Sequence, residues 1–167
     1  MEQALVLARR RRDAQLLAPA LVGRGSVLLE EGRRDEASML AAEALELGPR
    51  FVEVAGYPSV IHAAWLMRDL GLEDDFTSLL DASLATPWVD AAAAICSGEL
   101  RRAADVLEEI GFPTGEAYAR LRAAKQLVEE GRRAEADAEL NRALAFYREV
   151  GATAYVREGE ALLAESA

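Results

Sequence analysis

The sequence contains only one cysteine, Cys96, and one histidine, His62. A single cysteine excludes an internal disulfide and suits a reducing compartment. The same scarcity rules out the usual zinc ligand sets, which need several Cys or His residues, so we expect no metal and no cofactor. A Cys96–His62 nucleophile pair stays formally open. We favour the alternative, in which Cys96 fills the core and His62 is a packing or surface residue.

Basic residues are outnumbered, and long apolar runs are missing. The 19 Lys and Arg face 29 Asp and Glu, a formal net charge of −10, whereas a nucleic-acid-binding surface needs a basic face. No apolar run approaches the roughly 20 residues of a membrane-spanning helix. The charges near the start follow the apolar stretch, which is the reverse of a secretory signal. We therefore expect a cytoplasmic protein with no nucleic-acid and no membrane partner.

Catalytic motifs are absent from the sequence. The segment Gly23-Arg-Gly25 lacks the lysine and the preceding strand of a phosphate-binding loop, and neither GxSxG nor HExxH occurs. Paired carboxylates such as Glu30-Glu31 and Glu129-Glu130 could perform acid–base chemistry if burial separated their pKa values. They stand at expected helix ends beside turn glycines, where solvated surface is the default. We expect no enzymatic activity.

Helix-forming residues are abundant. Hydrophobic residues make up 51% of the chain, and the frequent alanines favour helices that approach one another closely. No alternating run rich in Val, Ile and Thr predicts a strand, and the five prolines stand at expected helix boundaries. About ten helices are predicted. They cover residues 2–12, 14–31, 33–47, 58–70, 73–84, 87–97, 99–110, 114–130, 132–149 and 153–165.

An internal repeat is the strongest pattern in the chain. Three segments run from a glycine to an alanine five residues later, at 32–37, 98–103 and 131–136, and a weaker copy at 71–76 ends in phenylalanine. The glycine can end one helix in the left-handed conformation, and the alanine lets the next helix pack closely. The four glycines lie 39, 27 and 33 residues apart, around the roughly 34-residue period of a known helical repeat. We expect these glycines in turns and these alanines buried.

Residues 18–49 resemble one complete tetratricopeptide repeat, and residues 117–148 resemble it less fully because Arg148 stands where proline is usual. The matching small, large and helix-stopping residues of the first copy are Gly25, Leu28, Gly32, Ala37, Ala44 and Pro49. The resemblance implies an all-α fold, an α-α superhelix of about four helix pairs with a C-terminal capping helix. It implies a single domain over residues 1–167.

The ends of the chain suggest a larger parent. Residues 2–12 are similar to the second helix of an earlier pair, and residues 153–165 suit a cap. We expect a C-terminal part of a longer protein, or a short relative of one. The stretch 100–166 is similar to the helical tails of large bacterial signalling and transcriptional regulators, which place a nucleotide-cyclase or DNA-binding module and a signalling ATPase ahead of such tails. This similarity implies a bacterial signalling role.

In the family that the sequence resembles, the first helix of each pair lines a concave binding surface. The resemblance implies that this surface carries Val22, Ser26, Ile61, Trp65, Arg68, Trp88, Ala92, Tyr118 and Lys125. We expect Trp65 and Trp88 to be partly exposed and to flank one pocket, with Arg68 as a charged anchor at its rim. The alternative is that both tryptophans fill gaps between alanine-rich helices. The family's peptide-carboxylate clamp needs Lys and Asn where Val22 and Ser26 stand, so that clamp is not supported.

The leading functional hypothesis is a regulatory interaction module that binds a partner protein or peptide. One alternative is a small-molecule sensor whose pocket lies on the concave face. Another is self-assembly, in which the N-terminal edge stacks on a second copy to form a homodimer.

Overall fold

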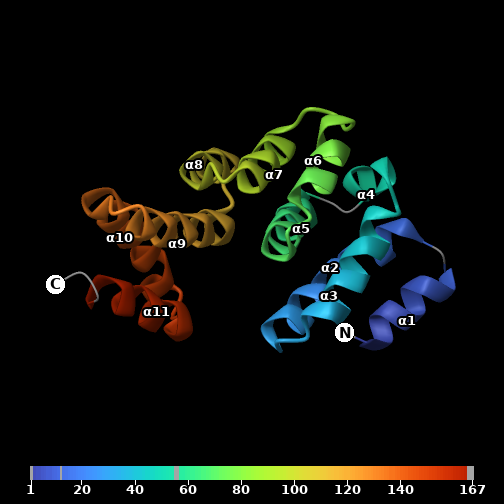
Figure 1. The fold of residues 1–167 in the computed structure, drawn as a ribbon, viewed down its shortest axis with the longest axis horizontal. Helices are drawn as coiled ribbons and strands as arrows, with labels where there is room; N and C mark the ends of the chain where they lie inside the picture. Colours follow the sequence, from blue (N-terminus) through green and yellow to red (C-terminus); the bar gives the residue numbers. More distant parts are fainter. Residues whose placement is uncertain (1, 12, 55–56, 165–167) are drawn as a thin grey trace. The chain divides into compact units, whose positions relative to one another are not determined.

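The computed structural model describes residues 2–11, 13–54 and 57–164. Within these residues the chain forms eleven helices and no strand, so the expected all-α class is confirmed there (Figure 1). The helices are α1 (Glu2–Arg11), α2 (Ala14–Glu30), α3 (Arg34–Leu45), α4 (Pro49–Val54), α5 (Tyr57–Leu70), α6 (Glu73–Asp81), α7 (Pro87–Ser97), α8 (Leu100–Ile110), α9 (Pro113–Glu129), α10 (Arg133–Glu149) and α11 (Thr153–Ala164).

Two prolines behave differently from expectation. Pro49, expected only to end a helix, begins the short α4, where its missing N–H costs nothing. Pro19 lies inside α2 and not at a boundary. The helix starts well before it because Asp13 caps the N-terminus, its carboxylate accepting a hydrogen bond from the Gln15 amide at 2.9 Å.

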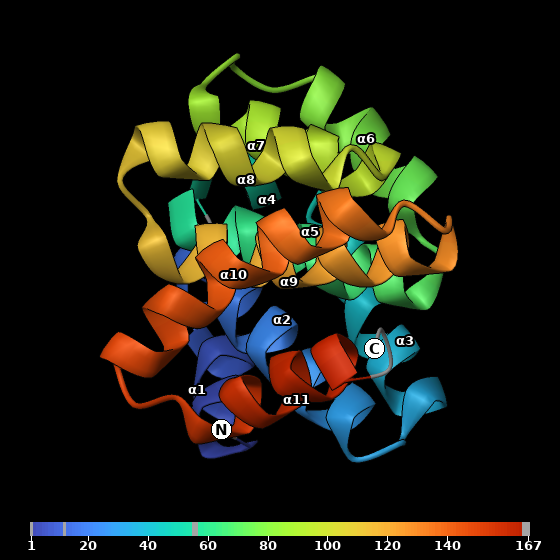
Figure 2. The ribbon, with the colours of Figure 1, turned by 90° about the vertical axis from the view of Figure 1, so that its left-hand side faces the viewer.

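The chain divides into two compact units, Met1–Gly98 and Glu99–Ala167. In the first unit α2 pairs with α3, and α5 contacts α2 and also α7 (Figure 1). In the second unit α9 contacts both α8 and α10, and α11 contacts α10. Figures 1 and 2 both show α11 on the side of α9 and α10 that faces away from α8.

The expected turn glycines are confirmed. Gly32, Gly98 and Gly131 all have positive φ, at 75°, 82° and 74°, and all three follow a helix end. The amide of Gly32 donates to the Leu29 carbonyl, and the amide of Gly131 donates to the Val128 carbonyl, both at 3.0 Å. These bonds satisfy carbonyl groups that the helix ends would leave unpaired. A side chain at these positions would strain the backbone.

The alanines of the repeat lie where helices meet. Ala37 and Ala103 are fully buried, and Ala136 is 1% exposed, as expected. Phe76, which takes the same place in the weaker copy, is also fully buried and meets Phe51 edge-to-face at 5.6 Å between ring centroids. The larger ring is therefore packed in the core at the position that alanine takes in the other copies.

Replacing Ala37, Ala103 or Ala136 by leucine is expected to destabilise the protein by about 1–3 kcal/mol, because the added atoms overpack a close helix contact. Thermal and urea denaturation followed by circular dichroism measure the change. Leucine at the exposed Ala42 or Ala145 is the matched control, and it should leave stability nearly unchanged. Wild-type stability in all three buried variants would show that the repeat register is wrong.

Candidate functional site

Four of the residues expected on a groove in the first unit are buried. Val22 of α2 is 2% exposed, and Ile61 and Trp65 of α5 are 1% and 6% exposed. The expected partial exposure of Trp65 is therefore wrong, and the alternative of a gap-filling core residue holds for it. The reason is the position of α5, which contacts α2 as well as α7, so more than one of its faces is covered (Figure 1). Ala92 is likewise fully buried.

The other two expected residues of α2 and α7 are half-buried. Ser26 donates its hydroxyl hydrogen bond to the Val22 carbonyl of its own helix at 3.0 Å. Trp88 follows Pro87 in the first turn of α7, behind a cap in which the Thr86 hydroxyl accepts from the Val89 amide at 3.2 Å. Since Trp65 is buried and Trp88 is only half-buried, the two indoles do not form an exposed pair.

Arg68 is a capping group and not a rim anchor. Its Nη1 donates to the carbonyl oxygens of Ile95 at 3.1 Å and Cys96 at 3.2 Å, at the C-terminus of α7. A positive charge is favoured at this end of a helix because the last carbonyl groups are unpaired and carry partial negative charge. The side chain is half-buried in this position. The expectation of a ligand-facing guanidinium is therefore corrected.

Cys96 is a buried thiol. It is 5% exposed, and burial raises its pKa to about 11, against a smaller lowering by a hydrogen bond with Thr77. The nucleophilic form of cysteine is the thiolate, so this thiol is suppressed. His62, by contrast, is exposed on α5. Cys96 is buried and its thiolate is disfavoured, and both facts argue against a Cys96–His62 nucleophile pair.

Cys96 is expected to react with a thiol reagent at pH 8 at least about a hundredfold more slowly in the native protein than in denaturant, because a pKa two units higher leaves about a hundredfold less thiolate. Absorbance after addition of an aromatic disulfide reagent measures the rate. Ser97, the next residue after Cys96, is exposed, so Ser97→Cys in a Cys96→Ala background is the matched control and should react quickly. Equal rates for the two proteins would contradict the buried thiol.

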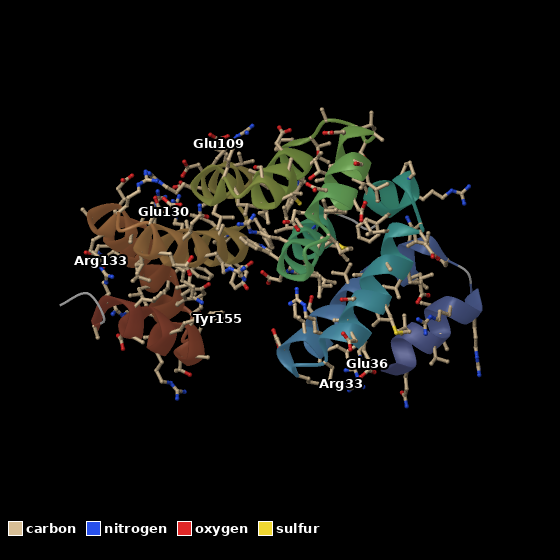
Figure 3. All side chains as sticks on the ribbon, viewed as in Figure 1. Arg33, Glu36, Glu109, Glu130, Arg133 and Tyr155 are labelled. Atoms are coloured by element: carbon tan, nitrogen blue, oxygen red, sulfur yellow. The ribbon has the colours of Figure 1, made fainter. Side chains whose placement is uncertain are left out.

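In the second unit, the two expected residues of α9 meet α11. Tyr118 lies edge-to-face with Tyr155 at 6.2 Å between centroids, and the Lys125 ammonium pairs with the Glu158 carboxylate. The Arg122 guanidinium lies 5.7 Å from the centroid of the Tyr118 ring. We call these five residues the tyrosine face. Figure 3 labels Tyr155, which lies in the first turn of α11, and 39% of Tyr155 is exposed.

Tyr147 of α10 lies beneath this face. Its ring stacks on Tyr155 at 4.7 Å with an interplanar angle of 13°, and the residue is 4% exposed. Burial, and then the neighbouring Tyr155, Tyr118 and Glu158, raise the pKa of Tyr147. Its hydroxyl has no hydrogen-bond partner among the residues that the structure describes.

The largest charged cluster of the second unit centres on Arg120, which the sequence analysis did not single out. This side chain is 1% exposed. Its guanidinium lies 2.7 Å from Glu116 and from Glu139, 3.0 Å from Glu108 and 3.2 Å from Asp105. Burial alone would lower its pKa, but the hydrogen bonds to Glu116 and Glu139 outweigh burial and raise it.

Two further arginines extend this cluster, and we call the whole set the arginine network. Arg101 of α8 reaches Glu135 at 2.7 Å and Glu139 at 3.2 Å, while Arg142 of α10 reaches Glu108 at 2.7 Å. The Arg142 hydrogen bond holds the pKa of Glu108 below its usual value. The network ties α8, α9 and α10 together. The sequence feature that could have revealed this network is Arg120 itself, which stands among alanines and leucines on the buried face of α9.

The described part of the chain contains neither a candidate metal site nor a candidate membrane span. No group of three or more His, Cys, Asp or Glu residues there could hold a metal ion, and no helix there has the length and apolar character needed to cross a membrane. Comparisons with protein-family models, with curated proteins and with solved structures give no match. The tyrosine face is therefore the candidate site that the geometry itself offers.

Proposed function

We propose that the chain is a tetratricopeptide-like helical-repeat module that binds a partner protein or peptide. Ion pairs between residues one repeat apart support the repeat. Arg9 pairs with Glu43, Arg101 with Glu135 and Arg142 with Glu108, each at a separation of 34 residues, and Lys125 pairs with Glu158 at 33. In an array with a period of about 34 residues, equivalent positions of successive repeats are neighbours.

A repeated charged turn supports the same arrangement. Arg33 contacts Glu31 at 3.0 Å and Glu36 at 2.7 Å, and Figure 3 shows Arg33 beside Glu36. In the other unit Arg132 contacts Glu130 at 2.9 Å and Glu135 at 2.8 Å. The same residue types therefore make the same contacts around Gly32 and Gly131.

The exposed ring of Tyr155 carries the binding proposal. Tyrosine offers a large rigid apolar surface with a polar tip, and aromatic residues are enriched among the anchors of protein interfaces. The other members of the tyrosine face are a second tyrosine, two cationic side chains and a carboxylate. Such a surface suits a peptide or protein segment with both apolar and charged side chains.

Photo-crosslinking tests this proposal. Benzoylphenylalanine replaces Tyr155 and keeps an aromatic ring there, and the same amino acid at the exposed Ala145 of α10 is the matched control. In cells that make the protein, ultraviolet light should give a discrete protein adduct from position 155 and none from 145. Adducts from neither position, or equal adducts from both, would reject the tyrosine face as the binding surface.

Self-assembly is the second candidate function, and exposed apolar residues near the N-terminal edge favour it. Val6 and Leu7 of α1 are 45% and 55% exposed, and Leu16 of α2 is 48% exposed. Burial of such residues against a second copy would be favourable. Sedimentation equilibrium over a concentration series measures this, and a strictly monomeric protein would exclude it.

A further inference from the structure

Helix α11 is held less firmly than the other long helices of its unit. Gly159 is the one buried residue of α11, whereas α9 buries eight residues and α10 buries six. The apolar side chains of α11 that meet the core, among them Val156, Leu162 and Leu163, are only partly buried. Since buried apolar area supplies most of the docking free energy, α11 is the element of this unit that opens most easily.

The surface beneath α11 is an apolar seat with room for one small residue. Leu140, Leu144 and Tyr147 of α10 form it, all 4% exposed or less. A Cβ atom at Gly159 would lie 2.7 Å from Cδ2 of Leu144 and 3.2 Å from Cδ1 of Leu140. The closest contact of the seat therefore accepts glycine and rejects a bulky side chain.

Three cationic side chains surround the seat, and each of them pairs with an oxygen atom of α11. Lys125 pairs with Glu158, Arg148 pairs with Glu160 at 2.9 Å, and Arg133 donates to the Leu162 carbonyl at 2.6 Å. Figure 3 shows Arg133 close to α11. The seat is thus complementary to a helix that carries carboxylates on both sides of its small residue.

One group under α11 is left without a partner. The Tyr147 hydroxyl, buried below Tyr155, has no hydrogen-bond partner within the described residues. A buried polar group in this state disfavours the docked helix relative to one that supplies a polar partner.

We propose that α11 is a displaceable occupant of the seat on α10, and that the seat accepts an acidic amphipathic helix of a partner protein. That helix carries a small residue at the closest contact and a carboxylate on either side of it. Apolar residues stand three positions before and three to four positions after, as Val156, Leu162 and Leu163 do around Gly159. This goes beyond the proposed function and is a separate mode of binding, because displacement of α11 would remove Tyr155 and Glu158 from the tyrosine face.

Hydrogen exchange of the wild-type chain tests whether α11 opens. Its amides are expected to exchange at least about tenfold faster than those of α10, through an opening that leaves α9 and α10 folded. Exchange of α11 and α10 at one common rate, set by global unfolding, would overturn the proposal. This measurement uses no substitution and no partner, so its result is independent of the crosslinking at position 155.

A labelled peptide of residues 152–164 then probes the seat in the full-length chain. Gly159→Leu should detach the chain's own helix, so the peptide should bind this variant at least about tenfold more tightly than wild type, because competition for the seat is removed. A peptide with leucine in place of its glycine is the control and should not bind. Lys125→Glu with Arg148→Glu in the Gly159→Leu chain should weaken binding of the peptide.

Equal affinity of the peptide for wild type and Gly159→Leu would overturn the proposal. Light scattering identifies the remaining alternative, in which two copies exchange α11 and form a dimer. Such a dimer would assign the seat to a second copy and reject the partner protein. If Gly159→Leu fails to fold, hydrogen exchange in the wild-type chain decides.

Discussion

Replacing Arg120 by methionine is expected to lower the free energy of unfolding by about 3–5 kcal/mol, the range for removing one partner of a buried ion pair. Methionine preserves much of the side-chain volume, so the loss comes from charge. Glu139, itself 7% exposed, would lose its 2.7 Å contact with Arg120 and keep only Arg101 at 3.2 Å. Urea denaturation followed by circular dichroism measures the change.

Two further variants separate the buried pair from the exposed part of the arginine network. Arg142→Ala removes an arginine that is 46% exposed, and exposed pairs contribute only about 0–1 kcal/mol. The double variant Arg120→Met, Glu139→Leu should recover much of the loss, because it removes both buried charges together. Equal effects of Arg120→Met and Arg142→Ala would show that the network is solvated.

Replacing Trp65 by alanine is expected to cost about 3–5 kcal/mol, the range for truncating a large core aromatic residue. The residue is 6% exposed on a helix that contacts both α2 and α7. Removing the indole would therefore leave a cavity enclosed by protein. The half-buried Trp88 is the matched control, and its truncation should cost less. Differential scanning calorimetry or urea denaturation measures both.

The same pair of variants decides between core and groove for Trp65. A core residue loses stability and leaves the binding of any partner to the tyrosine face unchanged once the protein is folded. Near-wild-type stability of Trp65→Ala would contradict the core assignment and restore the groove. The Trp88→Ala protein, measured in parallel, shows how much of the effect belongs to burial and how much to removal of any indole.

The helices and glycine turns of this chain could be predicted from the sequence because they depend on local contacts. Helix interiors, caps and glycine turns are held by hydrogen bonds between residues three to five apart. Gly32 and Gly131 therefore lie in the expected turns, and Ala37, Ala103 and Ala136 lie at the expected close contacts. The ten expected helices are all present within a few residues of their expected bounds. Among the helices of the described residues only α4 was missed, because Pro49 was expected to end a helix and instead begins one.

Which face of each helix is covered was decided by the tertiary structure. Trp65 and Trp88 look alike in sequence, yet one is buried and the other half-buried, because burial depends on which helices lie against α5. Arg68 donates to carbonyl groups 27 and 28 residues further on, at the end of α7, and Arg120 meets carboxylates on three helices. Apart from the Arg120–Glu116 pair, which lies within one helix, these contacts join residues on different helices, so the spacing of residues along one helix does not predict them.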